Sequence, residues 1–396
     1  MKVLEDMKVV DFTQAFSGPF CTLQLADFGA EVIKVERPFI GDQSREWFPI
    51  KDGYSGYYAS INRNKKGITL DIGKPEGTEV VKELIKDADV IVENFKVGTL
   101  DKFGLGYEDV KKINPGIIYA SISGFGQNTT LKKSPAYDNI IQSMTGFQYM
   151  TGFPDEQEVR CSSAIGDSFT GLNCSLGIIA AYLRKLKTGE GARIDVSMFD
   201  CIFGILEPHI LAKTVAGQET FRMGNADWFL FAPYDVYRCR DGWFSIAVTD
   251  NEQYERFCRV IGNEELIRDG RFIDNSSRCA NVDALNDKIA PFFADKTREE
   301  LERLFNEEDI INAPLLTVPE IIEHPHAEAR GMMVWVEDPG LGKFRTTSNP
   351  MKLNETPPVY EKAAPLLGED TKDILLGEGF AEGEIEKLKD NEVIQF

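Results

Sequence analysis

Residues 7–38, MKVVDFTQAFSGPFCTLQLADFGAEVIKVERP, contain two short apolar stretches with a helix-like stretch between them. MKVVDF at 7–12 predicts a strand, a turn at Gly18-Pro19 follows, and FCTLQLADFG at 20–29 predicts a helix. EVIKVERP at 31–38 then predicts a second strand. Two strands joined by one helix are typical of a βαβ unit, whose strands lie parallel in one sheet.

The same alternation continues to about residue 125. Further strands are predicted for GITLDI at 67–72, DVIVENF at 89–95 and GIIYASISGFG at 116–126. Helices are predicted between them, at 75–88, 99–105 and 107–114. Residues 43–64 are rich in aromatic side chains, and we expect them to form an irregular loop. The pattern predicts an α/β fold with a doubly wound parallel sheet.

The rest of the chain adds a second kind of structure. A long helix is predicted at 168–191, ending in basic residues and Gly189, and a strand and helix follow at 193–206. From about residue 225 the pattern changes, and we expect a smaller α+β domain over 225–320. Its predicted elements are a hairpin at 234–248, turning at Arg240-Asp241-Gly242, and helices at 251–262 and 298–309. A strand pair at 331–353 and a helical pair at 371–394 are predicted to end the chain.

The charge of the chain limits its partners. Its 396 residues include 44 basic and 64 acidic side chains, which give a formal net charge of −20. This acidity disfavours nucleic acid and anionic membrane, because both bind basic surfaces, whereas a small anionic ligand needs only a local basic pocket. No run of about 18 apolar residues is present, and the first twelve residues lack the apolar core of a signal peptide. We expect no membrane contact.

Cysteine and histidine usage restricts the chemistry further. The seven cysteines are odd in number, scattered, and without a Cys-x-x-Cys pair. This favours a reducing cytoplasm and argues against a disulfide framework or a zinc site. Only three histidines are present, at His209, His324 and His326. We therefore expect a cytoplasmic protein with no metal site and with chemistry that does not depend on histidine.

Asp167, in SAIGDS at 163–168, lies where an apolar stretch meets the predicted long helix. One interpretation is a helix N-cap, whose carboxylate accepts free backbone N–H groups. The other is a nucleophile, because a helix N-terminus holds a carboxylate ionised and the small residues Gly166 and Gly171 leave room for a substrate. The two interpretations are compatible, and the pattern alone does not separate them.

Other candidates follow the predicted strands. The chain has neither a phosphate loop nor a G-x-G-x-x-G motif opening a helix after the first strand. Asn94 follows a predicted parallel strand, where doubly wound sheets place ligands, although it would also suit a simple turn. Tyr137 would suit either a site or the core. Five cations near strand ends or in loops would together suit a phosphate-bearing ligand: Arg37, Lys65, Lys66, Lys96 and Lys102.

These residues occur in motifs that resemble one family over essentially the full length. The chain resembles the class III CoA-transferases, the family of formyl-CoA:oxalate and carnitine CoA-transferases. The likeness rests on Val10-Asp11-Phe12 with Ser17-Gly18-Pro19, Gly29-Ala30-Glu31-Val32-Ile33-Lys34-Val35-Glu36, Gly41-Asp42-x-x-Arg45, Asn64-Lys65-Lys66 with Leu70-Asp71, Val92-Glu93-Asn94-Phe95, Gly166-Asp167, and Lys187-Thr188-Gly189-x-Gly191. Together these motifs are specific for the superfamily and much less so for the substrate.

The resemblance implies both an architecture and a site. It implies a large CoA-binding domain made from residues 1–224 and the returning segment 321–396, and two chains interlocked as a homodimer. The catalytic residue would be Asp167, and the substrate pocket would contain Phe16, Trp47 and Tyr57. CoA contacts would fall on Arg37, Leu70, Asn94, Phe95, Lys102, Tyr137 and Met198. Acyl-CoA and small carboxylic acids would be substrates, with no permanently bound cofactor.

The implied reaction trades activated acyl groups. Asp167 would attack the donor thioester to give a mixed anhydride, and the CoA thiolate would then convert it to an aspartyl-CoA thioester. An acceptor acid would attack that thioester and finally regain CoA. The thioester energy is kept, so neither ATP nor a metal is required, but water must be excluded because it would hydrolyse the anhydride.

Two departures bear on the substrate. Phe16 stands where some members carry glutamine, and the loop 248–253 lacks the glycine run of the formyl-CoA:oxalate enzymes. Through PAYDNIIQSMTGFQYMTGFPD at 135–155 and FAPYDVY at 231–237, the chain is more similar to members that take acetyl-CoA and oxalate. The alternatives are an α-methylacyl-CoA racemase-like enzyme and a CoA-binding protein without turnover. Tyr137 disfavours the racemase, because that family carries a histidine there and tyrosine is a poor base at neutral pH.

Overall fold

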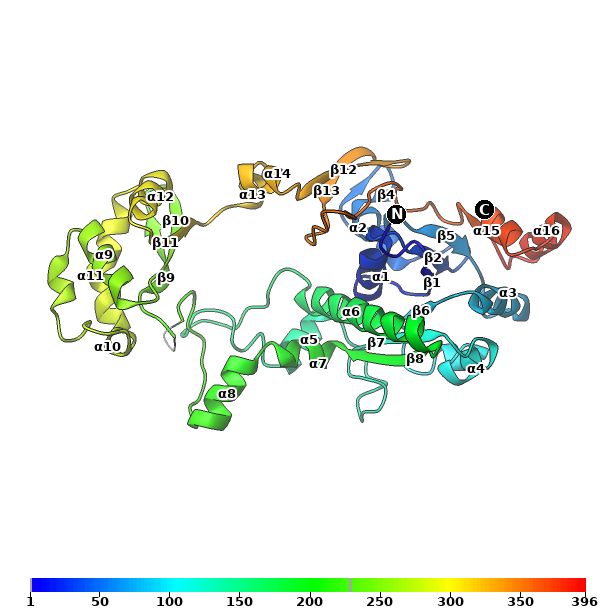
Figure 1. The fold of residues 1–396 in the computed structure, drawn as a ribbon, viewed down its shortest axis with the longest axis horizontal. Coiled ribbons are helices and arrows are strands. Elements are labelled where there is room, and N and C mark those ends of the chain that lie inside the picture. The colour runs from blue at the N-terminus through cyan, green and yellow to red at the C-terminus, as the bar shows by residue number, and fades with distance from the viewer. Residues whose placement is uncertain (1, 228–229) are drawn as a thin grey trace. The chain divides into compact units, whose positions relative to one another are not determined.

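The computed structural model describes residues 2–227 and 230–396. The chain divides into two compact units (Figure 1): a large unit of Met1–Phe147, Cys161–Leu211 and Pro325–Phe396, and a small unit of Gln148–Arg160 and Ala212–His324. The sequence placed the divisions at 224/225 and 320/321, whereas they fall here at 211/212 and 324/325, and a short earlier segment joins the small unit. The large unit is therefore assembled from both ends of the chain.

The large unit contains a six-stranded sheet whose strands are all parallel. Its order is β5 (Lys66–Thr69), β2 (Glu31–Glu36), β1 (Lys8–Asp11), β6 (Val90–Glu93), β7 (Ile118–Ser123) and β8 (Ala192–Ser197). Strands β2 and β5 are thus added in sequence order on one side of β1, and β6, β7 and β8 are then added on the other side. The order reverses between β1 and β6, and open parallel sheets bind ligands at the carboxyl ends of the strands beside such a reversal.

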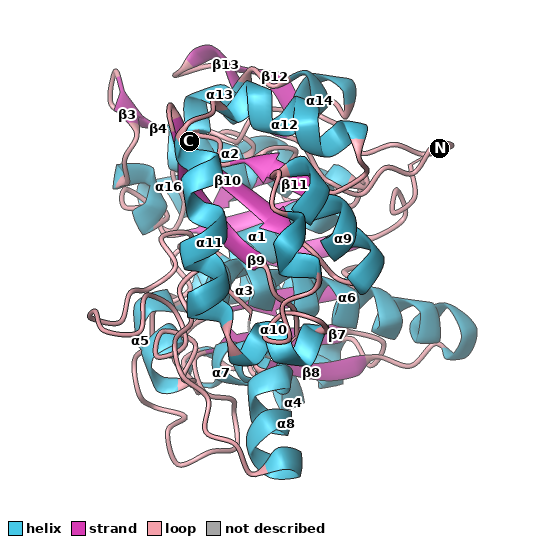
Figure 2. Ribbon diagram, turned by 90° about the vertical axis from the view of Figure 1, so that its left-hand side faces the viewer, coloured by secondary structure: helices cyan, strands magenta, loops and turns pink. Residues whose placement is uncertain are grey.

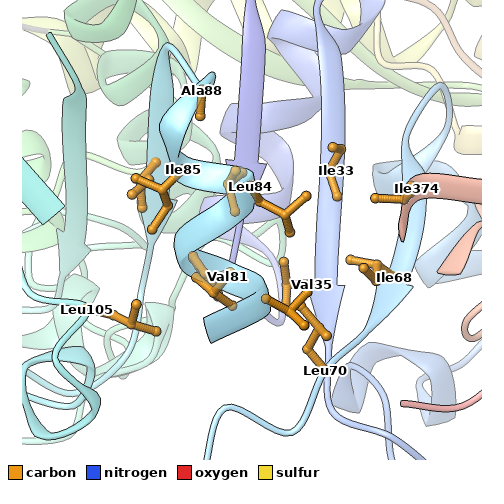
Figure 3. Close-up of a cluster of buried hydrophobic side chains, with 14 of the residues drawn as sticks. Ile33, Val35, Ile68, Leu70, Val81, Leu84, Ile85, Ala88, Leu105 and Ile374 are labelled. Atoms are coloured by element: carbon orange, nitrogen blue, oxygen red, sulfur yellow. The ribbon is translucent and has the colours of Figure 1, made fainter. Parts of the chain in front are cut away.

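Helices cover both faces of this sheet because successive strand residues point to opposite faces. Val9 packs with helices α1 (Ser17–Asp27) and α6 (Ile165–Thr188), whereas Val10 packs with α3 (Pro75–Lys86) and α4 (Tyr107–Ile113). Figure 3 shows the second layer, in which Val81, Leu84 and Ile85 of α3 belong to the same buried cluster as Ile33 and Val35 of β2. The fold is therefore α/β with a doubly wound parallel sheet, as the alternation predicted.

The C-terminal segment completes the second layer. Ile374 of α15 (Thr371–Gly377) and Ile385 of α16 (Glu382–Asp390) are part of the core. Beyond them, the Asp71 N–H donates to the Val393 carbonyl at 2.8 Å. The Gln395 N–H donates to the hydroxyl of Thr69 at 2.7 Å. The predicted helical pair and the predicted strand pair, β12 (Met333–Asp338) and β13 (Gly342–Thr347), are both present.

The prediction of an irregular loop over 43–64 is wrong for much of that stretch. It contains η1 (Gln43–Glu46), a small hairpin of β3 (Ile50–Lys51) and β4 (Tyr54–Ser55), and α2 (Gly56–Asn62). Ser55 caps α2 by accepting the Tyr58 N–H. The Arg45 guanidinium lies 3.8 Å from the centre of the buried Tyr58 ring. These contacts come from tertiary packing, so the local pattern of aromatic residues did not indicate them.

No helix of the described chain is both long and apolar enough to cross a membrane. The remaining elements outside the small unit's core are η2 (Leu100–Phe103), α5 (Asp138–Met144), α7 (Met198–Gly204), α8 (Glu207–Ala216) and α14 (Pro325–Ala329).

The small unit has an antiparallel sheet packed against helices (Figure 2). Its strands are β11 (Ile311–Pro314), β10 (Gly242–Ala247) and β9 (Tyr234–Cys239), and its helices are α9 (Asn251–Val260), η3 (Glu264–Ile267), α10 (Asn275–Ala280), α11 (Val282–Ala294), α12 (Arg298–Glu307) and α13 (Val318–Ile322). Phe244, Phe257, Phe293 and Phe305 fill its core. The predicted hairpin is confirmed, with the turn between Cys239 and Gly242.

Candidate active site

A cleft of about 330 Å³ opens at the carboxyl ends of the strands where the sheet order reverses. Its walls come from the loop after β1, the turn after β6, the end of β7 with the loop that follows it, and the N-terminal ends of α6 and α7. The lining residues are Gln14, Ala15, Ser17, Gln43, Asn94, Phe95, Lys96, Val97, Ile122, Ser123, Gly124, Lys132, Ser134, Pro135, Ala136, Tyr137, Asp167 and Met198.

A pair of hydrogen bonds joins the loop after β1 to the turn after β6, where the strand order reverses. The Gln14 N–H donates to the Asn94 side-chain oxygen at 2.9 Å, and the Asn94 amide donates to the Gln14 carbonyl at 2.8 Å. Asn94 therefore satisfies both backbone groups of Gln14, which no sheet ladder reaches. This closes the floor of the cleft with a fixed geometry.

A buried ion pair holds the same loop from the other side. Lys34 and Asp42 are fully buried and 2.9 Å apart. Lys34 also donates to the Thr13 carbonyl at 2.8 Å, and Asp42 accepts the Ala15 N–H at 3.1 Å. Ala15 has φ +66°, a left-handed conformation that costs an L-residue roughly 1–2 kcal/mol. The surrounding bonds maintain this strain, which often accompanies functional sites.

Asp167 lies in the first turn of α6 and faces the cleft. It is not the N-cap: Ala164 holds that position, and the buried side chain of Asp138 accepts the Gly166 N–H at 2.7 Å. Burial and the neighbouring negative charge of Asp138 raise the pKa of Asp167 to about 7, while hydrogen bonding from Ser17 opposes this rise. The carboxylate is thus close to half ionised at neutral pH, and its ionised form is a stronger base than an ordinary aspartate.

Aromatic side chains gather beside this carboxylate. The Phe16 ring lies 5.6 Å from that of Tyr57 and 5.4 Å from that of Phe20, and Trp47 lies 5.2 Å from Tyr57. Burial, with the negative charge of Asp167, raises the pKa of Tyr57 to about 12. The three residues expected for the substrate pocket, Phe16, Trp47 and Tyr57, therefore form one cluster. Tyr57 is near enough to sense the charge of Asp167, but none of the three is among the cleft residues.

The residues expected to contact CoA divide into two groups. Asn94, Phe95, Tyr137 and Met198 line the cleft with Asp167, and Tyr137 is 61 % exposed. Arg37, Leu70 and Lys102 are not among the cleft residues.

Within the second group, the Leu70 side chain is only 2 % exposed and belongs to the core beneath the sheet. Its backbone N–H is bonded to the Glu36 carbonyl at 2.8 Å, so Leu70 offers a ligand almost no surface. Arg37 and Lys102 are exposed.

The expected basic patch does not form as a unit. Lys65 is fully buried, 3.1 Å from Asp11, and burial lowers its pKa to about 8. Lys66 pairs with Glu31 on the surface. These two lysines therefore serve the fold, and the cations that line the cleft are Lys96 and Lys132.

Sequence analysis missed several cleft residues, including Gln14, Ser17, Gln43 and Lys132. Ser17 and Gln43 lie within motifs that carried the resemblance, so those motifs were the available signal. Lys132 carried no signal, because its loop reaches the strand ends only in the folded chain. Among the described residues, no cluster of three or more His, Cys, Asp or Glu side chains is suited to a metal ion.

Known proteins are similar to this chain both in sequence and in fold. Residues 4–371 match the model of CoA-transferase family III. The succinyl-CoA:mesaconate CoA-transferase of Haloarcula hispanica is 37 % identical, over 97 % of this chain and 98 % of that protein. The acetyl-CoA:oxalate CoA-transferase of Acetobacter aceti is 36 % identical, over 92 % and 93 %.

A solved structure agrees with these matches. A CAIB/BAIF family protein from Brucella suis superposes with a TM-score of 0.85 at 34 % identity, over 95 % of this chain and 99 % of that one. The likeness therefore spans the large unit, the small unit and the returning C-terminal segment. Of the alternatives that the sequence left open, these relatives support the transferase, and the chain belongs to CoA-transferase family III as a class III CoA-transferase.

Proposed function

We propose that this transferase moves CoA from a short acyl-CoA to a small dicarboxylic acid, with Asp167 as the covalent nucleophile. The observation that carries the proposal is the position of Asp167: within the described chain it is the one carboxylate that lines the cleft, and it lies at a helix N-terminus. A carboxylate at that position can be ionised while partly desolvated, which suits nucleophilic attack.

The proposed exchange consists of four attacks in sequence. An Asp167 oxygen attacks the donor thioester carbon, the C–S bond breaks, and CoA leaves as the thiolate from a mixed anhydride. The thiolate attacks the Asp167 carboxyl carbon and expels the donor acid, which leaves an aspartyl-CoA thioester. The acceptor carboxylate attacks that same carbon and expels the thiolate. The thiolate then attacks the acceptor carbonyl and releases Asp167 as the carboxylate.

The aromatic cluster supports this course. Phe16, Trp47 and Tyr57 form an apolar wall close to Asp167. Such a wall excludes water from the anhydride and strengthens the polar contacts beside it. It would also limit the acceptor to a short acid.

The other end of the cleft suits the CoA moiety. Phe95, Tyr137 and Met198 offer apolar surface, and Lys96 and Lys132 offer cations to phosphate. In this proposal Arg37 and Lys102, both exposed, would meet a part of the nucleotide that extends beyond the cleft. Leu70 has no part in this proposal, because it is buried in the core.

The relatives support a dicarboxylic acceptor but do not single out oxalate. Those at 37 % and 36 % identity are named for mesaconate and oxalate, with succinyl-CoA and acetyl-CoA as donors. The shared chemistry is a short acid with two carboxyl groups. We therefore propose this class as acceptor, with oxalate as one candidate.

One experiment tests both the nucleophile and the acceptor class. Wild-type protein is incubated with acetyl-, succinyl- or formyl-CoA and a panel of mono- and dicarboxylic acids, and new CoA thioesters are measured by mass spectrometry. We expect exchange with dicarboxylates above monocarboxylates, and none with Asp167→Ala, while Asp200→Asn, an exposed change on α7, should behave as wild type. Exchange by a folded Asp167→Ala variant would rule out the covalent course.

A further inference from the structure

Ser17 lies beside the proposed nucleophile with little freedom to move. It is the first residue of α1, it is 5 % exposed, and it lines the cleft together with Asp167. Its carbonyl oxygen is so close to α6 that a Cβ atom added at Gly171 would lie 2.5 Å from it. Gly171 is one helical turn beyond Asp167, on the same side of α6. The start of α1 is therefore packed directly against the part of α6 that carries Asp167.

The loop before Ser17 fixes this position. Gln14 is held by Asn94 through two hydrogen bonds, and Ala15 is held in its left-handed conformation by Asp42. Hydrogen bonding from Ser17 to Asp167 lowers the pKa of that carboxyl against the effect of burial. The two side chains line the same cleft, so the Ser17 hydroxyl is near enough to affect the charge of Asp167.

We propose that the Ser17 hydroxyl is a catalytic hydrogen-bond donor that stabilises negative charge on one oxygen of Asp167 whenever the Asp167 carboxyl carbon is attacked. The inference rests on the covalent course proposed above and names a residue for part of it. A donor placed in advance where charge develops is worth most in a site that excludes water.

The role of Ser17 is specific to two of the four attacks. When the CoA thiolate adds to the carboxyl carbon of the anhydride, a C–S bond forms and the electron pair of the C=O bond moves to the carbonyl oxygen of Asp167, which Ser17 would stabilise. That pair returns as the donor carboxylate leaves. The same oxygen is charged when the acceptor carboxylate adds to the aspartyl thioester and the thiolate leaves. In the first and last attacks the carbon that is attacked belongs to the substrate. The negative charge then develops on a substrate oxygen, and a hydrogen bond from Ser17 to Asp167 does not stabilise it.

This specificity predicts which species accumulates. Without the hydroxyl, the mixed anhydride still forms, but its conversion to the aspartyl-CoA thioester is slowed. The ionised carboxylate also loses a hydrogen bond, which raises the pKa of Asp167. A merely structural serine would produce neither effect.

The test compares Ser17→Ala with Ser175→Ala, a buried α6 serine whose hydroxyl donates to the Leu172 carbonyl. For Ser17→Ala we expect kcat to fall about 100-fold, as when one oxyanion donor is lost, with the KM for acyl-CoA nearly unchanged. The acid limb of the pH–rate profile should shift to higher pH by about one unit. When no acceptor acid is added, only the first two attacks occur, and rapid quenching followed by peptide mass spectrometry should then show Asp167 carrying mainly the donor acyl group rather than CoA. Ser175→Ala should match wild type in each respect.

Asp167→Ala, measured in parallel, separates this inference from the proposed function. If Asp167→Ala still exchanges CoA, the covalent course fails and the inference fails with it. If Asp167→Ala is inactive but Ser17→Ala keeps the wild-type acid limb and the wild-type ratio of trapped species, only the role of Ser17 is overturned.

Discussion

Two carboxyl groups, Asp138 and Asp167, lie close enough for the negative charge of one to raise the pKa of the other. Asp138 also accepts the Gly166 N–H, so it both positions the first turn of α6 and tunes the group that this turn presents. Asp138 therefore affects both the geometry of the first turn and the charge beside Asp167. A useful substitution keeps the hydrogen bond to Gly166 and removes the negative charge.

The first prediction concerns pH. The nucleophile is the ionised form of Asp167, whose pKa is about 7, so kcat/KM should fall as the pH drops through 7 and level off above it. Asp138→Asn removes a negative charge but keeps an oxygen for the Gly166 N–H, so the acid limb should move to lower pH. Steady-state rates over pH 5–9, with Asp200→Asn as the control, would check this. A limb that stays in place would show that Asp138 does not set the charge of Asp167.

The second prediction concerns the acceptor. The Phe16 ring contacts Tyr57 and stands on the apolar wall. Phe16→Gln would place an amide donor there and should shift the preference between short dicarboxylates and monocarboxylates by about 1–3 kcal/mol in kcat/KM. Affinity for CoA should barely change. An unchanged preference, or weaker CoA binding instead, would place Phe16 outside the acceptor pocket.

The sequence identified single residues of the cleft through the family resemblance or through their place after a predicted strand. Asp167, Asn94 and Met198 line the cleft as the resemblance implied. The interaction of Ser17 with Asp167 joins residues 150 positions apart, and local spacing carries no signal for such a contact. The burial of Leu70 was equally hidden, because a residue beside a strand end can face either the core or the cleft.

Among the elements, the contact of α1 with α6 sets the distance between Ser17 and Asp167. Gly171 permits this contact, since any side chain there would meet the Ser17 carbonyl. Gly177, on the same helix, has only ordinary contacts, with the nearest atom 3.5 Å from an added Cβ. The two glycines form a matched pair for a test.

The third prediction uses that pair. Gly171→Ala should force α1 and α6 apart and cost about 1–3 kcal/mol of unfolding free energy, and it should lower kcat. Gly177→Ala should be neutral or stabilise by up to about 1 kcal/mol, because alanine favours the helix. Urea unfolding followed by circular dichroism, together with the exchange assay, would measure both. Equal behaviour of the two variants would contradict the close approach at Gly171.

The elements that the sequence identified are those with strong periodicity. The six parallel strands and α6 were predicted because buried strands and a long helix carry clear apolar patterns. The hairpin of β3 and β4 and helix α2 were missed, because Tyr58 and Arg45 are fixed by packing rather than by local propensity. For α6, the first turn begins at Ile165, three residues before the predicted start.

At the scale of the whole molecule, α6 carries a second apolar side that the large unit leaves exposed. Leu176 is 66 % exposed and Leu183 is 54 % exposed. Together with the exposed Leu172 and Leu186 and the half-buried Ile179, they form a stripe with the spacing found in coiled coils. Exposed apolar surface of this kind marks an interaction site. This supports the homodimer that we propose from the family resemblance.

The fourth prediction follows from this stripe. Sedimentation should give about twice the chain mass of 44.4 kDa even at nanomolar concentration, since interlocked chains separate only by unfolding. Leu176→Lys should lower the thermal midpoint of the dimer, whereas Lys187→Ala on the same helix should not. A stable, active wild-type monomer would contradict the interlocked arrangement.

The large unit needs residues from both ends of the chain, and this affects the order in which the protein folds during synthesis. Thr69 and Asp71 receive their partners from Gln395 and Val393, so the edge of the main sheet stays open until these two residues have been synthesised. The small unit lies entirely before Pro325 in the sequence, so it can fold earlier. At about 5–20 residues per second, the first strands wait roughly 4–14 s after the small unit is complete. Through that interval the nascent chain exposes an unfinished sheet, which makes late translation the stage at which chaperones would be needed most.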